Sequence, residues 1–432
     1  MKVVGIVAEY NPFHLGHRYH IQKSKEETGA DCVIAVMSGN LVQRGDMAVT
    51  DKFIRAQEAI KNGADLVLEI PVCYSCQSAE IFARGSIEIL DALGVVDFLA
   101  FGSESADINL IRDVAAILSD EGEEFQKNLK FFLSEGISFP LARQRALSKS
   151  IEENHAEEII SASNDILAIE YLKNLKLIKS SIKPFAIKRI SSTYNDENIN
   201  NMFPSATAIR KVLREKKNEQ EDISDLNKLM KKSTTKDMAQ KLTQSFSEDN
   251  LISFDDFYEE LKLIILREEC QIKKYFEVNE GIENLILKNI LTCYSLEDLI
   301  EKVKTKRYTR TRIRRTLLNI LIGITKSDMH RILGKSQEYA EVDSSQRPYA
   351  RVLAFNDQGR SLLKQINENV KNEKIDIINK AASFKPASEL QEIKLSYDRI
   401  ANNMYYSKYR AYKKEVRAGS DMLMSPVYIK NK

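Results

Sequence analysis

Near its start the chain reads Val3-Val4-Gly5-Ile6-Val7-Ala8-Glu9-Tyr10-Asn11-Pro12-Phe13-His14-Leu15-Gly16-His17. Its first part is apolar and rich in β-branched residues without alternation, which is typical of a parallel strand buried on both faces. Asn11-Pro12 ends that strand, and the residues after His14 can begin a helix. The stretch therefore predicts a strand, a turn and a helix in direct succession.

Two histidines lie where this helix is expected to begin. His14 and His17 are three residues apart, so they should share one face of the helix. A helix N-terminus carries about half a positive charge and free backbone N–H groups, which suit a phosphate. Gly16 lacks a Cβ, so a nucleotide can approach the backbone there. The spacing alone is common, and ordinary polar surface histidines would give the same pattern.

The composition limits the class of protein. The chain has 432 residues, 43% hydrophobic and 29% charged, with a net charge of +2, so any nucleic-acid surface must be a local patch. Its apolar runs are shorter than the roughly 20 residues of a membrane span, and its start lacks a signal-peptide pattern, which favours a cytoplasmic protein. Five scattered cysteines argue against a disulfide framework. Cys73 and Cys76 form a Cys-x-x-Cys pair without a second pair or a nearby histidine.

Strand and helix signals alternate over residues 1–190. Amphipathic segments such as Asp51–Asn62 and Ala79–Leu93 separate short apolar runs, and this order predicts an α/β fold. We expect a Rossmann-like parallel sheet with helices on both faces and a ligand at the carboxyl ends of its strands. The predicted strands are Lys2–Ala8, Asp31–Met37, Ala64–Ile70, Asp97–Phe101 and Pro184–Ile190.

A second pattern that suits phosphate follows at Ser205-Ala206-Thr207-Ala208-Ile209-Arg210. Pro204 and two hydroxyl residues open an expected helix, and Arg210 lies on its first turns. Hydroxyls and free N–H groups at a helix start can bind phosphate, and arginine adds a forked contact. A similar helix start is expected at Asn164, where plain capping is the simpler explanation.

The rest of the chain divides by composition. Residues 1–216 would form the nucleotide-binding domain, and the polar residues 217–250 predict a loosely packed junction, although short helices are possible. Apolar spacings of three and four then predict a mainly helical region over 251–432. Tyr349–Phe355 and residues 374–378 could add a small α/β element within it.

The strongest charge feature lies in that helical region. Residues 302–315 contain eight Lys or Arg in fourteen positions, with Tyr308 among them. Arginine pairs well with phosphate oxygens and tyrosine can stack on a base, whereas a solvated charged face is the usual explanation of such a run. In a nearly neutral chain the run favours an RNA surface, and Arg307, Arg310 and Arg314 would share one helical face. The predicted RNA-binding residues are Lys306, Arg307, Arg310, Arg312, Arg314 and Arg315.

The two phosphate patterns resemble the signatures of the HxGH nucleotidyltransferase superfamily, which are His-x-Gly-His and Ser-Ser-Thr-x-Ile-Arg. Ala206 stands where the second serine is usual. A closer resemblance, to the bacterial tRNA(Met) cytidine acetate ligase family, covers essentially the whole chain. Besides both signatures, it rests on the blocks Met37–Gly45, Asp65–Pro71, Gln77–Ala83, Phe101–Glu104 and Arg351–Arg360.

This resemblance implies an enzyme that uses ATP and acetate to form acetyl-adenylate and pyrophosphate. The acetyl group would pass to N4 of the wobble cytidine of elongator tRNA(Met), and Mg²⁺ would accompany ATP. No membrane and no protein partner are implied. His14, His17 and Arg210 would be catalytic and supply positive potential to the phosphates. The ATP-binding residues would be Val7, Asn11, Pro12, Phe13, Gly16, His20, Gly102, Asn164, Arg189, Ser205 and Thr207.

The sequence leaves the role of one loop unassigned and allows two alternative functions to be weighed. The family often reads Gly-Tyr-His-Asp where this chain has Ser192-Thr193-Tyr194-Asn195-Asp196, so that loop has no assigned role. A small-molecule nucleotidyltransferase of the cofactor-adenylyltransferase type fits both signatures, but it would not need the helical half. A non-catalytic RNA-binding protein on a degenerate fold conflicts with the intact His14, Gly16, His17 and Arg210.

Overall fold

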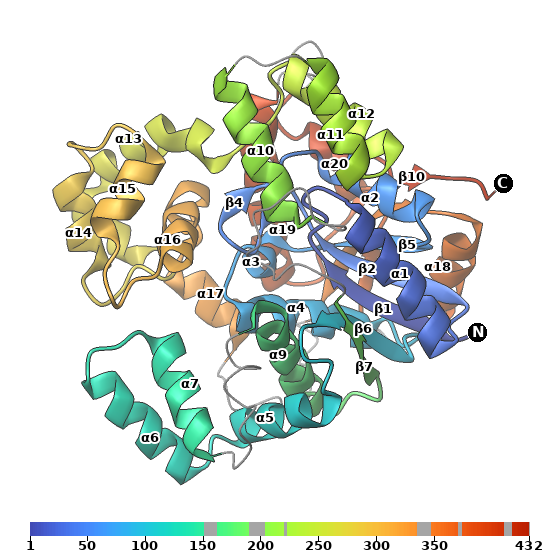
Figure 1. Ribbon diagram of the computed structural model, residues 1–432, viewed down its shortest axis with the longest axis horizontal. Coiled ribbons are helices and arrows are strands. Elements are labelled where there is room, and N and C mark those ends of the chain that lie inside the picture. The colour runs from blue at the N-terminus through green and yellow to red at the C-terminus, as the bar shows by residue number, and fades with distance from the viewer. Residues whose placement is uncertain are drawn as a thin grey trace.

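A computed structural model describes residues 1–150, 162–189, 204–219, 223–334, 347–369, 374–409 and 417–431. Residues 192–196, the segment to which the sequence assigns no role, lie outside these ranges. Figure 1 shows a central sheet with helices on both sides and a group of helices, coloured yellow to orange, beside it. In the described part of the chain, no helix is both long enough and apolar enough to span a bilayer.

The predicted parallel strands are confirmed, each within two residues of its expected bounds. They lie in the spatial order β5-β2-β1-β6-β7, and every neighbouring pair among them is parallel. The carboxyl ends of β1 and β6 are therefore adjacent at one edge. The strands are β1 (Val3–Ala8), β2 (Cys32–Ser38), β5 (Leu66–Ile70), β6 (Phe98–Ser103) and β7 (Lys183–Lys188).

Helices cover both faces of the sheet because its strands are apolar on both faces. On one face Val4 and Ile6 pack with α1 (Leu15–Thr28) and α2 (Lys52–Lys61). On the other face the core includes α4 (Ala79–Ala92) and α9 (Ser163–Leu177). The remaining elements of this half are β3 (Leu41–Val42), β4 (Asp46–Met47), α3 (Val72–Ser75), α5 (Ile108–Asp120), α6 (Glu123–Ser134) and α7 (Phe139–Ser150).

The segment after α10 (Ala206–Glu219) differs from the loosely packed junction expected over 217–250. It contains α11 (Ile223–Ser233) and α12 (Lys236–Ser247), two amphipathic helices that contribute to the core beside α2. Leu226 and Met230 of α11 are buried, and so are Met238 and Leu242 of α12. The apolar stripes of α11 and α12 are narrow and lie among polar residues, but they are sufficient to pack both helices against the core.

The C-terminal region is mainly helical, as expected, but its last part returns to the sheet. β8 (Tyr349–Phe355) pairs antiparallel with β5, and β9 (Asp376–Ile378) and β10 (Val427–Tyr428) pair with β8. Eight of the described strands thus form one mixed, mostly parallel sheet, and β3 and β4 form a separate antiparallel pair. The other elements are α13 (Tyr258–Glu268), α14 (Ile282–Asn289), α15 (Leu296–Val303), α16 (Arg310–Ile322), α17 (Lys326–Leu333), α18 (Asp357–Asn369), α19 (Glu389–Lys408), α20 (Ser420–Leu423) and 3₁₀ turns at Phe254–Phe257, Glu269–Lys274 and Ala381–Ser383.

A fully buried arginine in α2 joins the ends of two central strands. Arg55 donates from Nη1 to the carbonyl oxygens of Glu9 (2.6 Å) and Ser38 (3.1 Å), and from Nε to that of Thr50 (3.0 Å). Its Nη2 donates to the carbonyl oxygen of Gly39. A buried guanidinium is tolerated only when its donors are paired, so this arrangement fixes the chain where β1 and β2 end.

The variant Arg55→Met tests this role. It removes the donors of four buried carbonyl groups while keeping much of the side-chain volume. We expect the free energy of unfolding, measured with urea, to fall by about 3 kcal/mol or more. The control is Arg112→Met at an exposed position of α5, which should change the free energy of unfolding by less than about 0.5 kcal/mol. Equal effects of the two variants would contradict the role assigned to Arg55.

Candidate functional site

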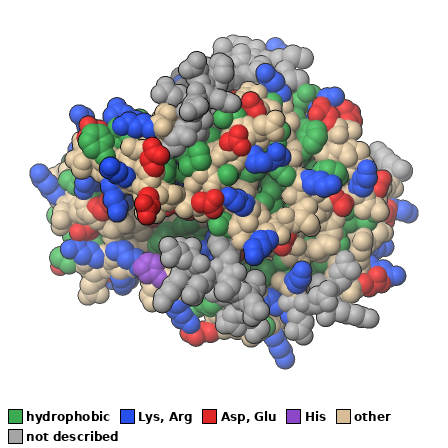
Figure 2. All heavy atoms as spheres, turned by 90° about the horizontal axis from the view of Figure 1, so that it is seen from below, with side chains coloured by type: hydrophobic (Ala, Val, Ile, Leu, Met, Phe, Trp, Pro, Cys, Tyr) green, Lys and Arg blue, Asp and Glu red, His purple; other side chains and the backbone are tan. Residues whose placement is uncertain are grey.

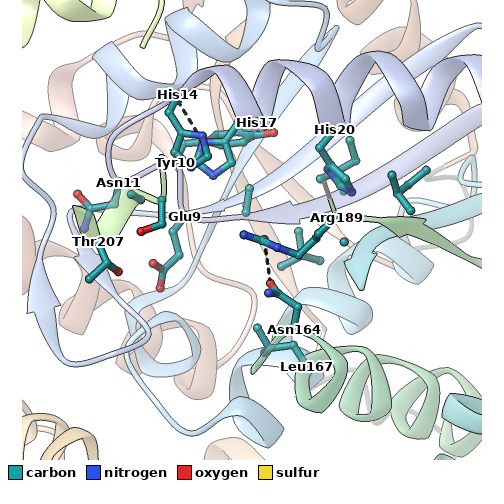
Figure 3. Close-up of a pocket in the computed structure, with 18 of the residues that line it drawn as sticks. Glu9, Tyr10, Asn11, His14, His17, His20, Asn164, Leu167, Arg189 and Thr207 are labelled. Carbon is teal, nitrogen blue, oxygen red and sulfur yellow. Dashed lines mark hydrogen bonds between the residues drawn. The ribbon is translucent and has the colours of Figure 1, made fainter. Parts of the chain in front are cut away.

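The ends of β1, β6 and β7 and the starts of α1, α9 and α10 meet at one pocket (Figure 3). The structure brings together here the three expected catalytic residues, His14, His17 and Arg210. Most of the expected ATP-binding residues line the same pocket, namely Val7, Asn11, Gly16, His20, Gly102, Asn164, Arg189, Ser205 and Thr207.

Two expected ligand residues do not line this pocket among the described residues. Pro12 and Phe13 precede α1, and Phe13 is fully buried. The Phe13 ring packs edge-on against Tyr10, with centroids 5.0 Å apart, and lies 5.6 Å from the His17 ring. Phe13 therefore supports His17 from behind instead of facing the cavity.

The two signature histidines are held against each other. The backbone N–H of His14 donates to Nδ1 of His17 at 3.2 Å, and the two rings stack with centroids 3.6 Å apart. Because Nδ1 of His17 accepts this bond, a neutral His17 carries its proton on Nε2. That N–H is then available to donate to a ligand oxygen.

The histidines differ from the cationic groups expected from the sequence. Burial, together with the nearby Arg189 and Arg210, lowers the pKa of His14 to about 3. Burial and Arg189 also lower the pKa of His20 to about 4, and burial holds that of His17 well below its usual range. The imidazoles are therefore neutral near pH 7 in the free pocket. The positive charge that lines the pocket comes from Lys188, Arg189 and Arg210.

The second signature is bonded directly to the first. Arg210 donates to the carbonyl oxygen of Asn11 at 2.6 Å and to Oγ1 of Thr207 at 3.1 Å. The Ser205 hydroxyl accepts the backbone N–H of Ala208 at 3.0 Å and so caps α10. Sequence segments nearly two hundred residues apart thus form one continuous wall.

Arg189 is positioned by a chain of polar contacts from α9. Its Nη1 donates to Oδ1 of Asn164 at 3.4 Å (Figure 3), and Nδ2 of Asn164 donates to Oε1 of Glu104 at 2.6 Å. The other Glu104 oxygen accepts the backbone N–H of Asp165 at 3.2 Å. The cap of α9 therefore comes from Glu104 at the end of β6, and Asn164 is left to orient Arg189.

Several buried polar atoms around this pocket have no hydrogen-bond partner among the described residues. They are the Tyr10 hydroxyl, Nδ2 of Asn11, Nδ1 of His14, Nε2 of His20 and Nε of Arg189. Buried polar atoms in folded proteins are nearly always bonded, to protein or to solvent. Their concentration at one pocket favours a polar ligand there.

Other lining residues were missed by the sequence reasoning. Glu9 and Gln43 lie inside the quoted blocks, where their position directly after a strand was an available signal. Phe82, Leu167 and Tyr171 also line the pocket. As apolar positions of amphipathic helices they cannot be told from core residues by pattern.

The Cys-x-x-Cys pair is not part of this pocket among the described residues. Cys73 and Cys76 are free and buried, and burial raises the pKa of Cys76 to about 12 and that of Cys73 well above its usual range. Thiols in this state are unreactive.

The basic run differs from the single RNA-facing helix expected. α16 begins at Arg310, so Arg307 lies outside the helix and does not share its face. Arg310 is paired with Glu297 and Glu301 of α15. Tyr308 is 5% exposed, so its ring is not available to stack on a base.

The later arginines of the run also make internal contacts. Arg312 lies 3.2 Å from a Glu280 oxygen, and Arg315 lies 3.5 Å from Glu277. Arg314 approaches Oδ2 of Asp46 to 3.0 Å and donates from Nε to the carbonyl oxygen of Gly45 at 3.2 Å, so it docks α16 on the β3–β4 turn.

Lys306 and Arg307 are exposed and form no ion pair with a described residue. On the face shown in Figure 2, Lys and Arg side chains are interspersed with Asp and Glu instead of forming one broad basic patch. Within the run, these two residues are therefore the most accessible cations.

Comparison with known proteins adds independent information. The HIGH Nucleotidyl Transferase family matches residues 1–420. Curated relatives named tRNA(Met) cytidine acetate ligase include those of Thermoanaerobacter sp., 41% identical over 98% of both chains, and Clostridium perfringens, 38% identical over 99% of both. Crystal structures of Thermotoga maritima TmcAL, apo and bound with alpha-thio ATP, match with TM-scores of 0.88 and 0.86. They are 32% and 31% identical to this chain and cover 100% of both chains.

The buried neutral histidines predict that acid destabilises the fold. An imidazole in the unfolded chain has a pKa near 6.5, whereas that of His14 in the fold is about 3. Between these values the unfolded chain binds more protons. Stability is therefore full above about pH 6.5 and falls as the pH drops towards 3, by at most about 1.4 kcal/mol per pH unit for each histidine.

Urea unfolding between pH 5 and 7 measures this slope. His14→Gln should make it shallower, because one proton fewer is taken up on unfolding. The control is His330→Gln at an exposed position of α17, which should leave the slope unchanged. An unaltered slope in His14→Gln would rule out a neutral, buried His14.

Proposed function

The chain belongs to the tRNA(Met) cytidine acetate ligase family of the HIGH nucleotidyl transferases, and we propose that it activates acetate with ATP and acetylates N4 of the wobble cytidine in elongator tRNA(Met). The observation that carries the proposal is the pocket in which both phosphate signatures meet, on a chain that matches the family over its full length. The bound alpha-thio ATP of the Thermotoga maritima relative supports ATP as the nucleotide.

The first step would be attack of an acetate oxygen on the α-phosphorus of ATP, with pyrophosphate as the leaving group. The transition state is crowded and highly anionic, so the protein contributes positioning and charge stabilisation. Arg189 and Arg210 would supply fixed positive charge. His17 would donate from Nε2, and the free N–H groups at the start of α1 would bind phosphate oxygens.

Negative charge on a bound ligand would make His14 and His17 stronger hydrogen-bond donors. A neighbouring anion favours the protonated imidazole, so bound phosphates raise the depressed pKa values of His14 and His17. Neutral donors in the free pocket can thus become cationic donors around the triphosphate.

Mg²⁺ would accompany ATP, with its ligands drawn chiefly from phosphate oxygens and water. The described residues contain no cluster of three or more His, Cys, Asp or Glu side chains able to hold a metal ion. A metal that keeps most of its water shell fits this donor set, since Mg²⁺ at nucleotide sites takes few protein ligands.

The helical region would present the tRNA to the pocket. We assign nucleotide binding to residues 1–216 and tRNA binding to residues 251–432, with residues 217–250 as the junction between them. Strands β8, β9 and β10 of the C-terminal region complete the sheet of the nucleotide-binding part. Of the six basic residues expected to bind RNA, Lys306 and Arg307 are the most accessible, while Arg310, Arg312, Arg314 and Arg315 would act mainly by holding that surface in place.

The proposal is tested by incubating the protein with ATP, labelled acetate and bulk bacterial tRNA. Label should enter RNA only when ATP is present. His17→Ala should lower acetate-dependent ATP–pyrophosphate exchange by about 100-fold or more, since it removes a preorganised donor, while tRNA binding persists. Pyrophosphate release that depends on another small molecule, without label in RNA, would instead indicate a small-molecule nucleotidyltransferase.

The RNA surface has its own test. Replacing Lys306 and Arg307 together by serine should weaken tRNA binding and reduce the slope of log affinity against log salt by about 0.7–0.9 for each phosphate that the variant no longer neutralises. The matched control replaces Lys364 and Lys385, two exposed lysines outside the run. Equal binding by both double variants would show that the tRNA-binding surface lies elsewhere.

A further inference from the structure

Glu9 provides the only carboxylate among the described residues that line the pocket. It directly follows β1, and Figure 3 shows its side chain beneath Tyr10, between Thr207 and Arg189. The other charged side chains of the lining are cationic, namely Lys188, Arg189 and Arg210. An anionic group at this position needs an explanation, because the pocket otherwise suits anionic ligands.

Glu9 is fixed through one carboxylate oxygen and through its backbone carbonyl. Its Oε1 accepts the backbone N–H of Gln43 at 2.8 Å, and its backbone carbonyl accepts Nη1 of Arg55 at 2.6 Å. Oε2 receives no hydrogen bond from a described residue. The residue therefore presents one oriented acceptor that remains available to a ligand.

A carboxylate is poorly suited to two of the three reactants. ATP phosphates and acetate are both anionic, and a like charge at close range opposes their binding. The exocyclic amine of cytosine, in contrast, is a pure hydrogen-bond donor, and Asp and Glu are the side chains that accept from it. The chemistry of Glu9 thus matches the acetyl acceptor.

We propose that Oε2 of Glu9 binds the N4 amine of the acceptor cytidine and takes its proton during acetyl transfer, an inference that rests on the function proposed above. As N4 attacks, a bond forms between nitrogen and the acetyl carbon. The bond from that carbon to the AMP oxygen breaks, and AMP leaves with the electron pair. The N4 proton passes to Glu9 and then to water.

The same contact selects the base. Uridine carries an O4 acceptor where cytidine carries the N4 donor, so a uridine in this position would face the carboxylate with an unpaired acceptor. A buried polar group left unpaired opposes binding strongly. Glu9 would therefore act in specificity as well as in catalysis.

The experiment compares two half-reactions in Glu9→Gln, which keeps the size of the side chain and an oxygen for the Gln43 N–H. Acetate-dependent ATP–pyrophosphate exchange should stay near the wild-type rate. Single-turnover acetyl transfer to tRNA should fall by about 100-fold or more, the usual contribution of a general base. Hydroxylamine, a strong nucleophile that needs no base, should still trap the acetyl group.

Two further variants sharpen the result. Glu9→Asp keeps the carboxylate and should recover part of the transfer rate, which a merely structural role would not predict. The matched control, Glu26→Gln on the exposed face of α1, should behave as wild type. Urea unfolding checks that Glu9→Gln is folded.

Three outcomes would overturn the proposal. Wild-type transfer by Glu9→Gln would show that the carboxylate takes no proton. Loss of exchange together with transfer would assign Glu9 to ATP, for example through its metal ion. Absence of acetate-dependent exchange in the wild-type protein would remove the proposed function itself, and the assignment of Glu9 with it.

Discussion

The buried charge of Arg55 is the constraint on which the site depends. A guanidinium removed from water must bind an acceptor with each donor, and the available acceptors are backbone carbonyls where β1 and β2 end. A second buried cation, Lys52, is neutralised by Glu69 at 2.8 Å and Asp421 at 3.0 Å. Because Asp421 lies near the C-terminus, completing this pairing requires the last part of the chain. The loop that carries Glu9 and the histidines is thus fixed by charges that never meet the ligand.

An electrostatic contact also links the helical region to the nucleotide-binding part of the chain. Asp46, the first residue of β4, contacts Arg314 of α16 at 3.0 Å and Arg214 of α10 at 2.7 Å. Burial opposes ionisation of this carboxyl, yet the two arginines together lower its pKa to about 2. The Asp46 carboxylate therefore joins α10, the helix of the second signature, to α16. Of the arginines that resembled an RNA surface in the sequence, Arg314 joins the helical region to the nucleotide-binding part, and Arg310, Arg312 and Arg315 pair with acidic residues inside the helical region.

Local patterns allowed the five parallel strands and both signatures to be predicted, because strand, turn and helix start are set by neighbouring residues. The pairing of β8 with β5 could not be predicted, since its partner lies far away in the chain. The same limit explains Tyr308 and Arg314: a cation or ring in a basic run looks solvated until a distant segment covers it. In α11, the apolar stripe was hidden because polar residues outnumber apolar ones in its composition.

The lining of the pocket combines cationic groups, which favour phosphates, with one carboxylate, which does not. Arg189, Arg210 and the start of α1 form a wall that favours phosphates, and the histidines stay neutral until a ligand adds negative charge. Glu9 adds a carboxylate to this lining; the Gln43 N–H holds one of its carboxylate oxygens, and Arg55 holds its backbone carbonyl. Under the proposed function, repulsion between this carboxylate and the phosphates would orient the nucleotide towards the arginines and leave Glu9 to a neutral reactant that donates hydrogen bonds.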